Sequence, residues 1–244
     1  MGGSGEVSSG LYRGIAPGVS FVCAKILNRN GKGTLSNLIN GLEWIREIRK
    51  EYEIRIVNIS IEIGKYTPIS GEQDLTRLYD IINYLWEEGV MVLIAAGNAG
   101  PKAQTISSIA DGNACICVAC HDGDYVGRNG YNCSKFSGRG PGRHYHATQN
   151  YNPMRKPDLV APGSDITSCN AFFSRKGQSY YTIKSGTSMA APQISGACAL
   201  YMQKYPDATN NEIRTKLLLS AKDLEEPWYI QGAGMLQIDD FLNI

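Results

Sequence analysis

The sequence predicts a single α/β domain in which a mainly parallel, twisted sheet lies between two layers of helices. Short apolar segments bounded by glycines alternate with segments that repeat apolar residues at helical spacing. Such near-continuous apolar strands are typical of parallel sheets that helices cover on both faces. No linker or internal repeat divides the 244 residues, of which 43% are hydrophobic. Residues 1–244 are therefore expected to form one domain.

The first half of the chain carries most of this alternation. Four apolar segments are expected as strands: 19–27, 54–61, 90–96 and 115–120. Four periodic segments are expected as helices: 34–51, 75–88, 188–205 and about 210–220. Thr34 can cap the first helix, and Gly89 follows the second. Residues 121–185 are rich in glycine, serine, asparagine and proline, which predicts long loops with brief strands.

Charge and hydropathy exclude two classes of partner. The chain has 24 basic and 23 acidic side chains, a net charge of +1, so it has no basic excess to bind nucleic acid. Its uninterrupted apolar runs, such as residues 90–96, are far shorter than the roughly 20 residues that a membrane span requires. Neither nucleic acid nor a membrane is expected as a partner.

Cysteine usage favours free thiols. The seven cysteines are Cys23, Cys115, Cys117, Cys120, Cys133, Cys169 and Cys198. An odd number cannot pair completely within one chain, which favours reduced thiols and a cytoplasmic location. Three of them, followed by His121, have ligand types that bind zinc. Alternation along a strand points Cys115 and Cys117 to one face and separates them from the others, so structural cysteines are expected here.

Two polar segments lie where α/β folds bind ligands. Residues 95–100 (AAGNAG) follow an apolar strand, and residues 185–192 (SGTSMAAP) mark the start of a helix. Ser188 would lie near the positive end of that helix, where free N–H groups stabilise a developing oxyanion. An ordinary N-cap is the simpler alternative for Ser188. Pro192 is expected in the first turn, where a missing N–H costs nothing.

The segment GTSMAAPQISG closely resembles the nucleophile motif of the subtilisin-like serine proteases. Further segments resemble that family in the same order along the chain, over residues 13 to about 239. They are RGIAPGVSFVCAKIL, RIVNISI, GVMVLIAAGNAG, KFSGRGP, KPDLVAPGSDI and GAGMLQID.

The resemblance implies a subtilisin-like fold and a role for each matching residue. Ser188 falls on the nucleophile and Asn98 on the side-chain donor of the oxyanion hole. Ser60 matches the strand residue whose backbone pairs with an extended peptide or protein substrate. Ala95, Ala96, Gly97 and Thr187 match other substrate-binding positions. The family needs no cofactor for catalysis, but many members bind calcium as a structural ion, although no dense carboxylate loop is present here.

The sequence departs from the family pattern in two places. Ile61, Glu62 and Ile63 precede Gly64, where the family has small residues. Glu62 is either a solvent-exposed strand residue or one that narrows the substrate pocket and attracts a basic side chain. The family's catalytic aspartate and histidine precede the segment that resembles residues 13–17, and the twelve residues before it contain neither.

The domain is therefore expected to be incomplete at its N-terminus, with the aspartate and histidine supplied by sequence outside this chain. The resemblance places His121, His144 and His146 outside the family's histidine site, so they are not expected to rebuild a triad. The chain is not expected to be an α/β-hydrolase, because in that fold the catalytic histidine follows the nucleophile, and no histidine follows Ser188. An unpaired sheet edge would remain, which a complementing N-terminal fragment or self-association would cover.

Two functions follow from these expectations. The first is a serine endopeptidase that hydrolyses peptide bonds through an acyl-enzyme on Ser188. The second is a catalytically inactive subtilisin-like module that binds peptides or a protein partner.

Overall fold

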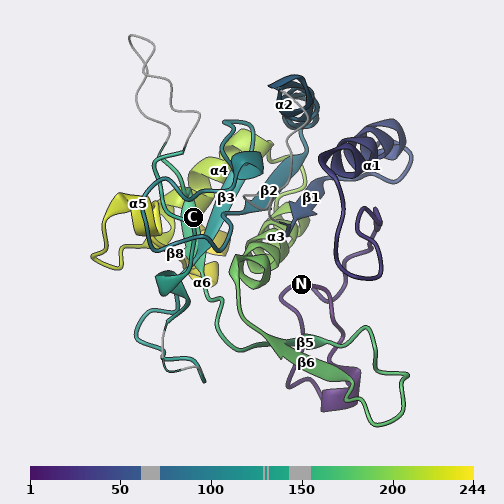
Figure 1. Ribbon diagram of the computed structural model, residues 1–244, viewed down its shortest axis with the longest axis vertical. Helices are drawn as coiled ribbons and strands as arrows, with labels where there is room; N and C mark the ends of the chain where they lie inside the picture. Colours follow the sequence, from purple (N-terminus) through teal and green to yellow (C-terminus); the bar gives the residue numbers. More distant parts are fainter. Residues whose placement is uncertain (62–71, 129, 131, 143–154) are drawn as a thin grey trace.

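The computed structural model describes residues 1–61, 72–128, 130, 132–142 and 155–244. In this part of the chain a six-stranded sheet lies between helices, as Figure 1 shows. In spatial order its strands are β1 (Ile56–Ile59), β2 (Met91–Ala95), β3 (Ile116–Cys120), β4 (Leu159–Ala161), β8 (Met235–Leu236) and β7 (Ala221–Lys222). All neighbours are parallel except β7, which pairs antiparallel with β8. The predicted α/β class with a mainly parallel sheet is confirmed.

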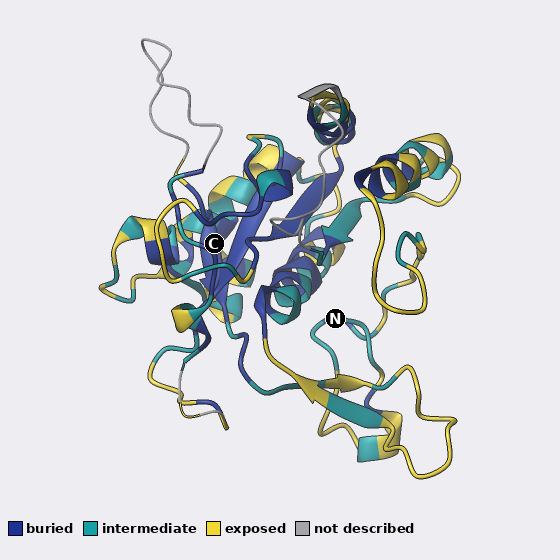
Figure 2. Cartoon of the chain, in the orientation of Figure 1, coloured by how far each residue is buried: buried dark blue, intermediate teal, exposed yellow. Residues whose placement is uncertain are grey.

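Helices cover both faces of the sheet. On one face lie α1 (Leu35–Ile48) and α2 (Glu72–Glu87). On the other lie α3 (Thr187–Lys204), α4 (Asn210–Leu219) and α6 (Ile238–Asn243), and the short α5 (Trp228–Gln231) precedes β8. Side chains of β2 alternate between these two cores, and Figure 2 shows its ribbon buried along its length. None of the described helices is long and apolar enough to cross a membrane.

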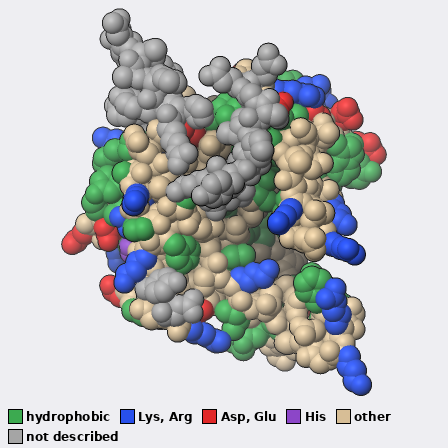
Figure 3. Space-filling model, viewed as in Figure 1, with side chains coloured by type: hydrophobic (Ala, Val, Ile, Leu, Met, Phe, Trp, Pro, Cys, Tyr) green, Lys and Arg blue, Asp and Glu red, His purple; other side chains and the backbone are tan. Residues whose placement is uncertain are grey.

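Smaller elements complete the described chain. A hairpin of β5 (Ile166–Cys169) and β6 (Tyr181–Lys184) stands outside the sheet and contacts the N-terminal segment. There the rings of Tyr12 and Tyr181 have centroids 4.8 Å apart. The 3-10 turns are η1 (Glu6–Ser8), η2 (Ser108–Ala110) and η3 (Cys133–Lys135). Figure 3 shows basic side chains scattered over one face of the molecule rather than gathered in one patch.

Local sequence signals explain where the helices begin. The Thr34 side chain accepts a hydrogen bond from the Asn37 N–H, and the Asn37 side chain accepts one from Thr34 in return. Thr209 and Glu212 form the same reciprocal pair at the start of α4. Each pair satisfies N–H groups that the first helical turn leaves without a partner. The predicted cap at Thr34 is confirmed.

One predicted strand is wrong. Residues 19–27 form no ladder with any described strand. Their side chains nevertheless alternate as in a strand: Val22, Ala24 and Ile26 pack on the core, while Phe21 and Cys23 are exposed. The apolar pattern therefore produces an extended segment but not a strand, because a strand requires a hydrogen-bonded neighbour.

A buried ionic network fixes β3, β4 and α4 relative to one another. Lys156 is 1% exposed, and its Nζ donates to Asp158 Oδ2 at 2.6 Å and to the Cys115 carbonyl at 3.0 Å. Asp158 also accepts hydrogen bonds from the Cys117 N–H at 2.7 Å and from Arg214 at 2.7 Å. Burial by itself would lower the pKa of Lys156, but the neighbouring acidic groups, Asp158 first and then Cys115 and Cys117, together outweigh burial and raise it. Lys156 is therefore charged at neutral pH.

All seven cysteines are free in the structure, two of them exposed and five buried. Burial raises the pKa of the Cys115, Cys117 and Cys198 thiols, which makes them poor nucleophiles. We expect a thiol reagent to modify Cys23 and Cys169 readily in the native chain. The other five should react only after denaturation. Mass spectrometry with two distinguishable alkylating reagents would count both groups, and fewer than seven thiols in denaturant without reductant would contradict the prediction.

Candidate active site

Ser188 lies in the first turn of α3, at the edge of the sheet where β1 and β2 end. Its hydroxyl donates a hydrogen bond to the Ser60 carbonyl, with the oxygens 3.2 Å apart. The N-cap is Gly186, whose φ of 148° favours glycine. Capping alone therefore does not explain Ser188, since a different residue holds that position.

Asn98 follows β2 and contacts the residue before Ser188. Its Oδ1 accepts hydrogen bonds from the Thr187 N–H at 3.0 Å and from the Thr187 hydroxyl at 3.3 Å. The same hydroxyl accepts a hydrogen bond from the Gly97 N–H at 3.2 Å. Thr187 is fully buried, so these contacts lock the loop after β2 onto the start of α3. Two of the segments singled out in the sequence thus meet at one place.

The other residues expected to bind substrate lie around this contact. Ala95 and Ala96 are 1% and 0% exposed and lead directly to Gly97 and Asn98. The Ala96 carbonyl accepts a hydrogen bond from the Ser107 N–H, and the Gly97 carbonyl accepts one from Gly138. These bonds fix the backbone behind Asn98. Glu62 lies outside the described residues.

Asn58 is a positioning residue that the sequence analysis missed. Its Nδ2 donates to the Ser60 hydroxyl at 2.8 Å, and its Oδ1 accepts from the Ser195 hydroxyl on α3 at 3.0 Å. It therefore holds the end of β1 against the helix that carries Ser188. One signal was available: Asn58 is a polar residue within the apolar run RIVNISI.

Asp122 supports the start of α3 from the other side. Its carboxylate accepts hydrogen bonds from the N–H groups of Gly163, Ser164 and Cys133 at 2.8–2.9 Å. The Gly163 carbonyl in turn accepts a hydrogen bond from the Gly186 N–H at 2.8 Å. Burial would raise the pKa of Asp122, but these hydrogen bonds outweigh burial and lower it. The carboxylate thus stays ionised and keeps the loop before Ser188 in place.

Pro192 is not where the sequence analysis expected it. It lies inside α3, four residues after Ser188, rather than in the first turn. The N–H that proline lacks would have bonded to the Ser188 carbonyl. The prediction that the missing N–H of Pro192 costs no hydrogen bond was therefore wrong, because the proline removes an internal hydrogen bond from the turn that begins at Ser188.

Among the three histidines the structure describes His121, whose imidazole contacts Gly123 and Glu226. Its Nδ1 accepts a hydrogen bond from the Gly123 N–H at 3.0 Å, and its Nε2 lies 3.7 Å from Glu226 Oε1. His144 and His146 lie outside the described residues. Within the described part of the chain, no three side chains of His, Cys, Asp or Glu are grouped as metal ligands. The site thus combines a serine hydroxyl, an asparagine amide and the positive end of an 18-residue helix.

The fold is thus that of an α/β protein with a serine in the first turn of a helix, at the carboxyl edge of a mainly parallel sheet. Residues 1–234 match the model of the Subtilase family, and the chain belongs to that family. It is 34% identical to Serine protease AprX of Bacillus subtilis (strain 168) over 97% of this chain and 54% of the relative. It is 28% identical to Subtilisin DY of Bacillus licheniformis over 93% of this chain and 69% of the relative.

Solved structures agree on the fold. The crystal structure of a lanthipeptide protease superposes with a TM-score of 0.72 at 19% identity, covering 94% of this chain and 71% of that one. Sphericase superposes with a TM-score of 0.67 at 23% identity, covering 87% and 66%. The chain spans about half the length of AprX, so that relative contains polypeptide beyond the part matched here.

Proposed function

We propose that this chain is the nucleophile-bearing part of a serine endopeptidase of the subtilase family. One observation supports the proposal above all others: Asn98, from the loop after β2, is hydrogen-bonded to Thr187, the residue next to Ser188. An amide beside a nucleophilic hydroxyl is what acyl transfer requires, since negative charge develops on the carbonyl oxygen under attack.

The proposed reaction has two halves. Ser188 Oγ attacks the carbonyl carbon of a peptide bond while its proton passes to a base, and the Ser188 N–H and the Asn98 amide stabilise the oxyanion. The C–N bond then breaks, the base returns the proton to the leaving amine, and an acyl-enzyme remains on Ser188. Water hydrolyses the ester with the same base, which restores the hydroxyl.

The base and the carboxylate that orients it would come from sequence outside residues 1–244. His121 is engaged by Gly123 and lies near Glu226, and the Ser188 hydroxyl donates to the Ser60 carbonyl. A peptide or protein substrate would lie extended at the end of β1, where its backbone can pair with Ser60. The chain by itself should therefore show little or no turnover of this kind.

The test compares the chain alone with a chimera that joins the portion of AprX preceding the matched segment to residue 1. A fluorophosphonate should modify Ser188 in the chimera, which should also hydrolyse a chromogenic peptide, and modification of the chain alone should be slow. The same chimera carrying Ser188→Ala should do neither.

Two results would count against the proposal. Equally fast modification of Ser188 in the chain alone would mean that a base lies within it. A folded chimera that binds peptides without hydrolysing them would favour the inactive binding module.

A further inference from the structure

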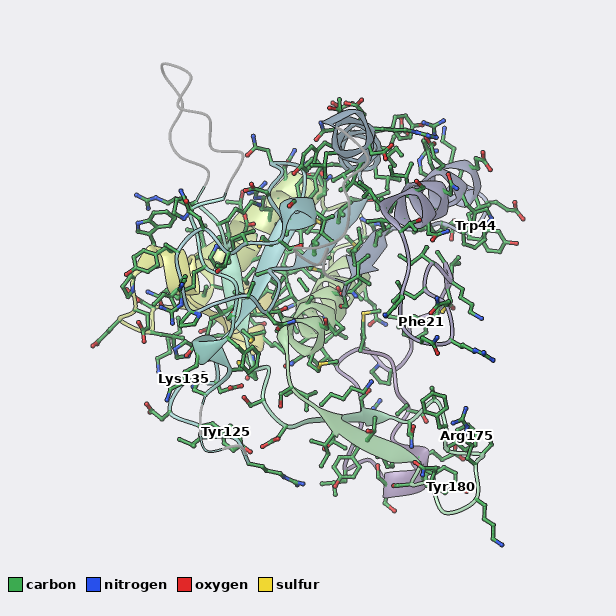
Figure 4. The ribbon with its side chains drawn as sticks, viewed as in Figure 1. Phe21, Trp44, Tyr125, Lys135, Arg175 and Tyr180 are labelled. Carbon is green, nitrogen blue, oxygen red and sulfur yellow. The ribbon has the colours of Figure 1, made fainter. Side chains whose placement is uncertain are left out.

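The hairpin loop, residues 170–180, connects β5 to β6 and carries exposed aromatic side chains. Phe172, Phe173 and Tyr180 are 51%, 53% and 55% exposed. Figure 4 shows Arg175 and Tyr180 in this loop, at the end of the hairpin farther from the sheet. Large apolar side chains that gather at one exposed place usually mark a surface that binds a protein or a membrane.

Hydrogen bonds give the hairpin loop a defined shape. The Asn170 N–H donates to the Tyr180 carbonyl at 2.8 Å, and the Asn170 side-chain amide donates to the Ser179 carbonyl at 2.9 Å. Asn170 Oδ1 in turn accepts a hydrogen bond from the Phe172 N–H at 3.0 Å. The rings of Phe173 and Tyr180 are stacked, with their centroids 5.7 Å apart. The loop therefore presents its rings in fixed positions, which lowers the entropic cost of binding a partner.

The same hairpin is basic. Residues 166–184 contain no acidic side chain and three basic ones: Arg175, Lys176 and Lys184. Arg175 Cζ lies 4.2 Å from the centroid of the Phe172 ring, in a cation–π contact. The whole chain has a net charge of only +1, so this positive charge is a local property of the hairpin. It favours an anionic partner, and it would repel the same hairpin of a second copy.

The place of the loop in the fold indicates what kind of anionic partner fits. The hairpin stands outside the sheet and projects from the body of the molecule (Figure 1). Extended or helical peptides are typically bound in grooves or along sheet edges. A projecting tip of aromatic and basic side chains instead suits a bilayer, whose headgroup layer accepts aromatic rings and whose anionic lipids attract Lys and Arg.

We propose that the hairpin loop binds the surface of a bilayer that contains anionic lipids. Its exposed rings would enter the headgroup layer, and Arg175 and Lys176 would pair with anionic headgroups. A few apolar and basic side chains suffice for such binding. The expectation that no membrane is a partner rested on the length of the apolar runs, which bears on spanning a bilayer and not on lying against one.

Membrane binding would leave the proposed active site accessible. The hairpin loop precedes β6 and Ser188 follows it, so the two lie at opposite ends of that strand. Binding of lipid and hydrolysis of peptides can therefore be measured separately. The inference does not rest on the proposed function.

Vesicles of phosphatidylcholine with about 30% phosphatidylserine provide the probe, and vesicles of pure phosphatidylcholine provide the comparison. The chain should sediment with the anionic vesicles and much less with the neutral ones. Sodium chloride at about 0.5 M should release it, because salt screens the charges.

Two double variants test the charge. Arg175→Gln combined with Lys176→Gln should weaken binding to the anionic vesicles about 30-fold, since each basic side chain near such a surface contributes about fivefold. Arg29→Gln combined with Lys32→Gln removes the same charge from another exposed loop. This control should weaken binding about twofold at most.

A tryptophan in the loop tests insertion. In the Phe172→Trp variant, brominated lipid in the anionic vesicles should quench fluorescence beyond the quenching seen in the parent chain, which has three tryptophans. The Phe21→Trp variant places the new indole on a different exposed apolar segment and should show no additional quenching. All the replaced side chains are exposed, so circular dichroism and urea unfolding should match the parent.

Four outcomes would overturn the inference. Equal binding to neutral and anionic vesicles, or equal losses in the two double variants, would exclude a role for the basic hairpin. Additional quenching in Phe21→Trp but not in Phe172→Trp would assign insertion to another surface. Binding of soluble polyglutamate as tightly as vesicles would indicate an acidic polypeptide as the partner. None of these measurements depends on catalysis, so each leaves the proposed function as it stands.

Discussion

Replacing Asn98 with alanine is expected to lower kcat of the active chimera about 10²–10³-fold with little change in KM, a magnitude known from subtilisin itself, a member of this family. The reason is that the amide beside Ser188 would bond the oxyanion more strongly than the ground-state carbonyl. Such an interaction acts on turnover rather than on substrate binding. Steady-state kinetics on a chromogenic peptide would measure both constants.

A matched variant separates this role from a structural one. Asn98 Oδ1 also holds the Thr187 N–H, so the alanine variant loses a structural contact as well. Asn98→Asp keeps an oxygen for that contact but replaces the donor with a negative charge. It should retain thermal stability and lose at least as much activity. Activity in the aspartate variant close to that of the parent would mean that Asn98 does not donate to the oxyanion.

Replacing Asp158 with alanine is expected to lower the free energy of unfolding by about 3–5 kcal/mol, the usual result of leaving a buried charge without its partner. Lys156 is 1% exposed, and its charge would face only the Cys115 carbonyl. Urea denaturation of the isolated chain, followed by circular dichroism, would measure the change. Asp158→Asn leaves a neutral polar partner and should cost less.

The control uses an ion pair at the surface. Arg77 lies 3.4 Å from Glu43, and the arginine side chain is 58% exposed. Because water screens such a pair, Arg77→Ala should change the free energy of unfolding by at most about 1 kcal/mol. Equal losses in the Asp158→Ala and Arg77→Ala variants would show that the buried network does not hold β3, β4 and α4 together.

Features encoded within a few neighbouring residues could be predicted from the sequence. The cap at Thr34 depends on a side chain three residues away, and α1 through α4 follow apolar spacing along single segments. The strands β2 and β3 are apolar throughout, so their burial between two layers was also predictable. The position of Ser188 at the start of a helix could likewise be predicted from the neighbouring residues.

Partnerships across the chain could not be predicted from local pattern. Asn58 holds β1 against α3 because it contacts Ser195, which lies far away in the sequence. Asp122 likewise holds the loop before Gly186 through Gly163, which is also distant in the sequence. Pro192 was assigned to a first turn because local sequence does not fix which residue begins α3.

Residues 19–27 show the division most clearly. The sequence by itself determined their alternation, since side-chain polarity at every second position selects an extended backbone with one face on the core. Only the tertiary structure decided whether they become a strand. A strand needs backbone hydrogen bonds to a neighbour, and in the described part of the chain a groove of about 980 Å³, lined by both this segment and β1, lies where such a neighbour would be.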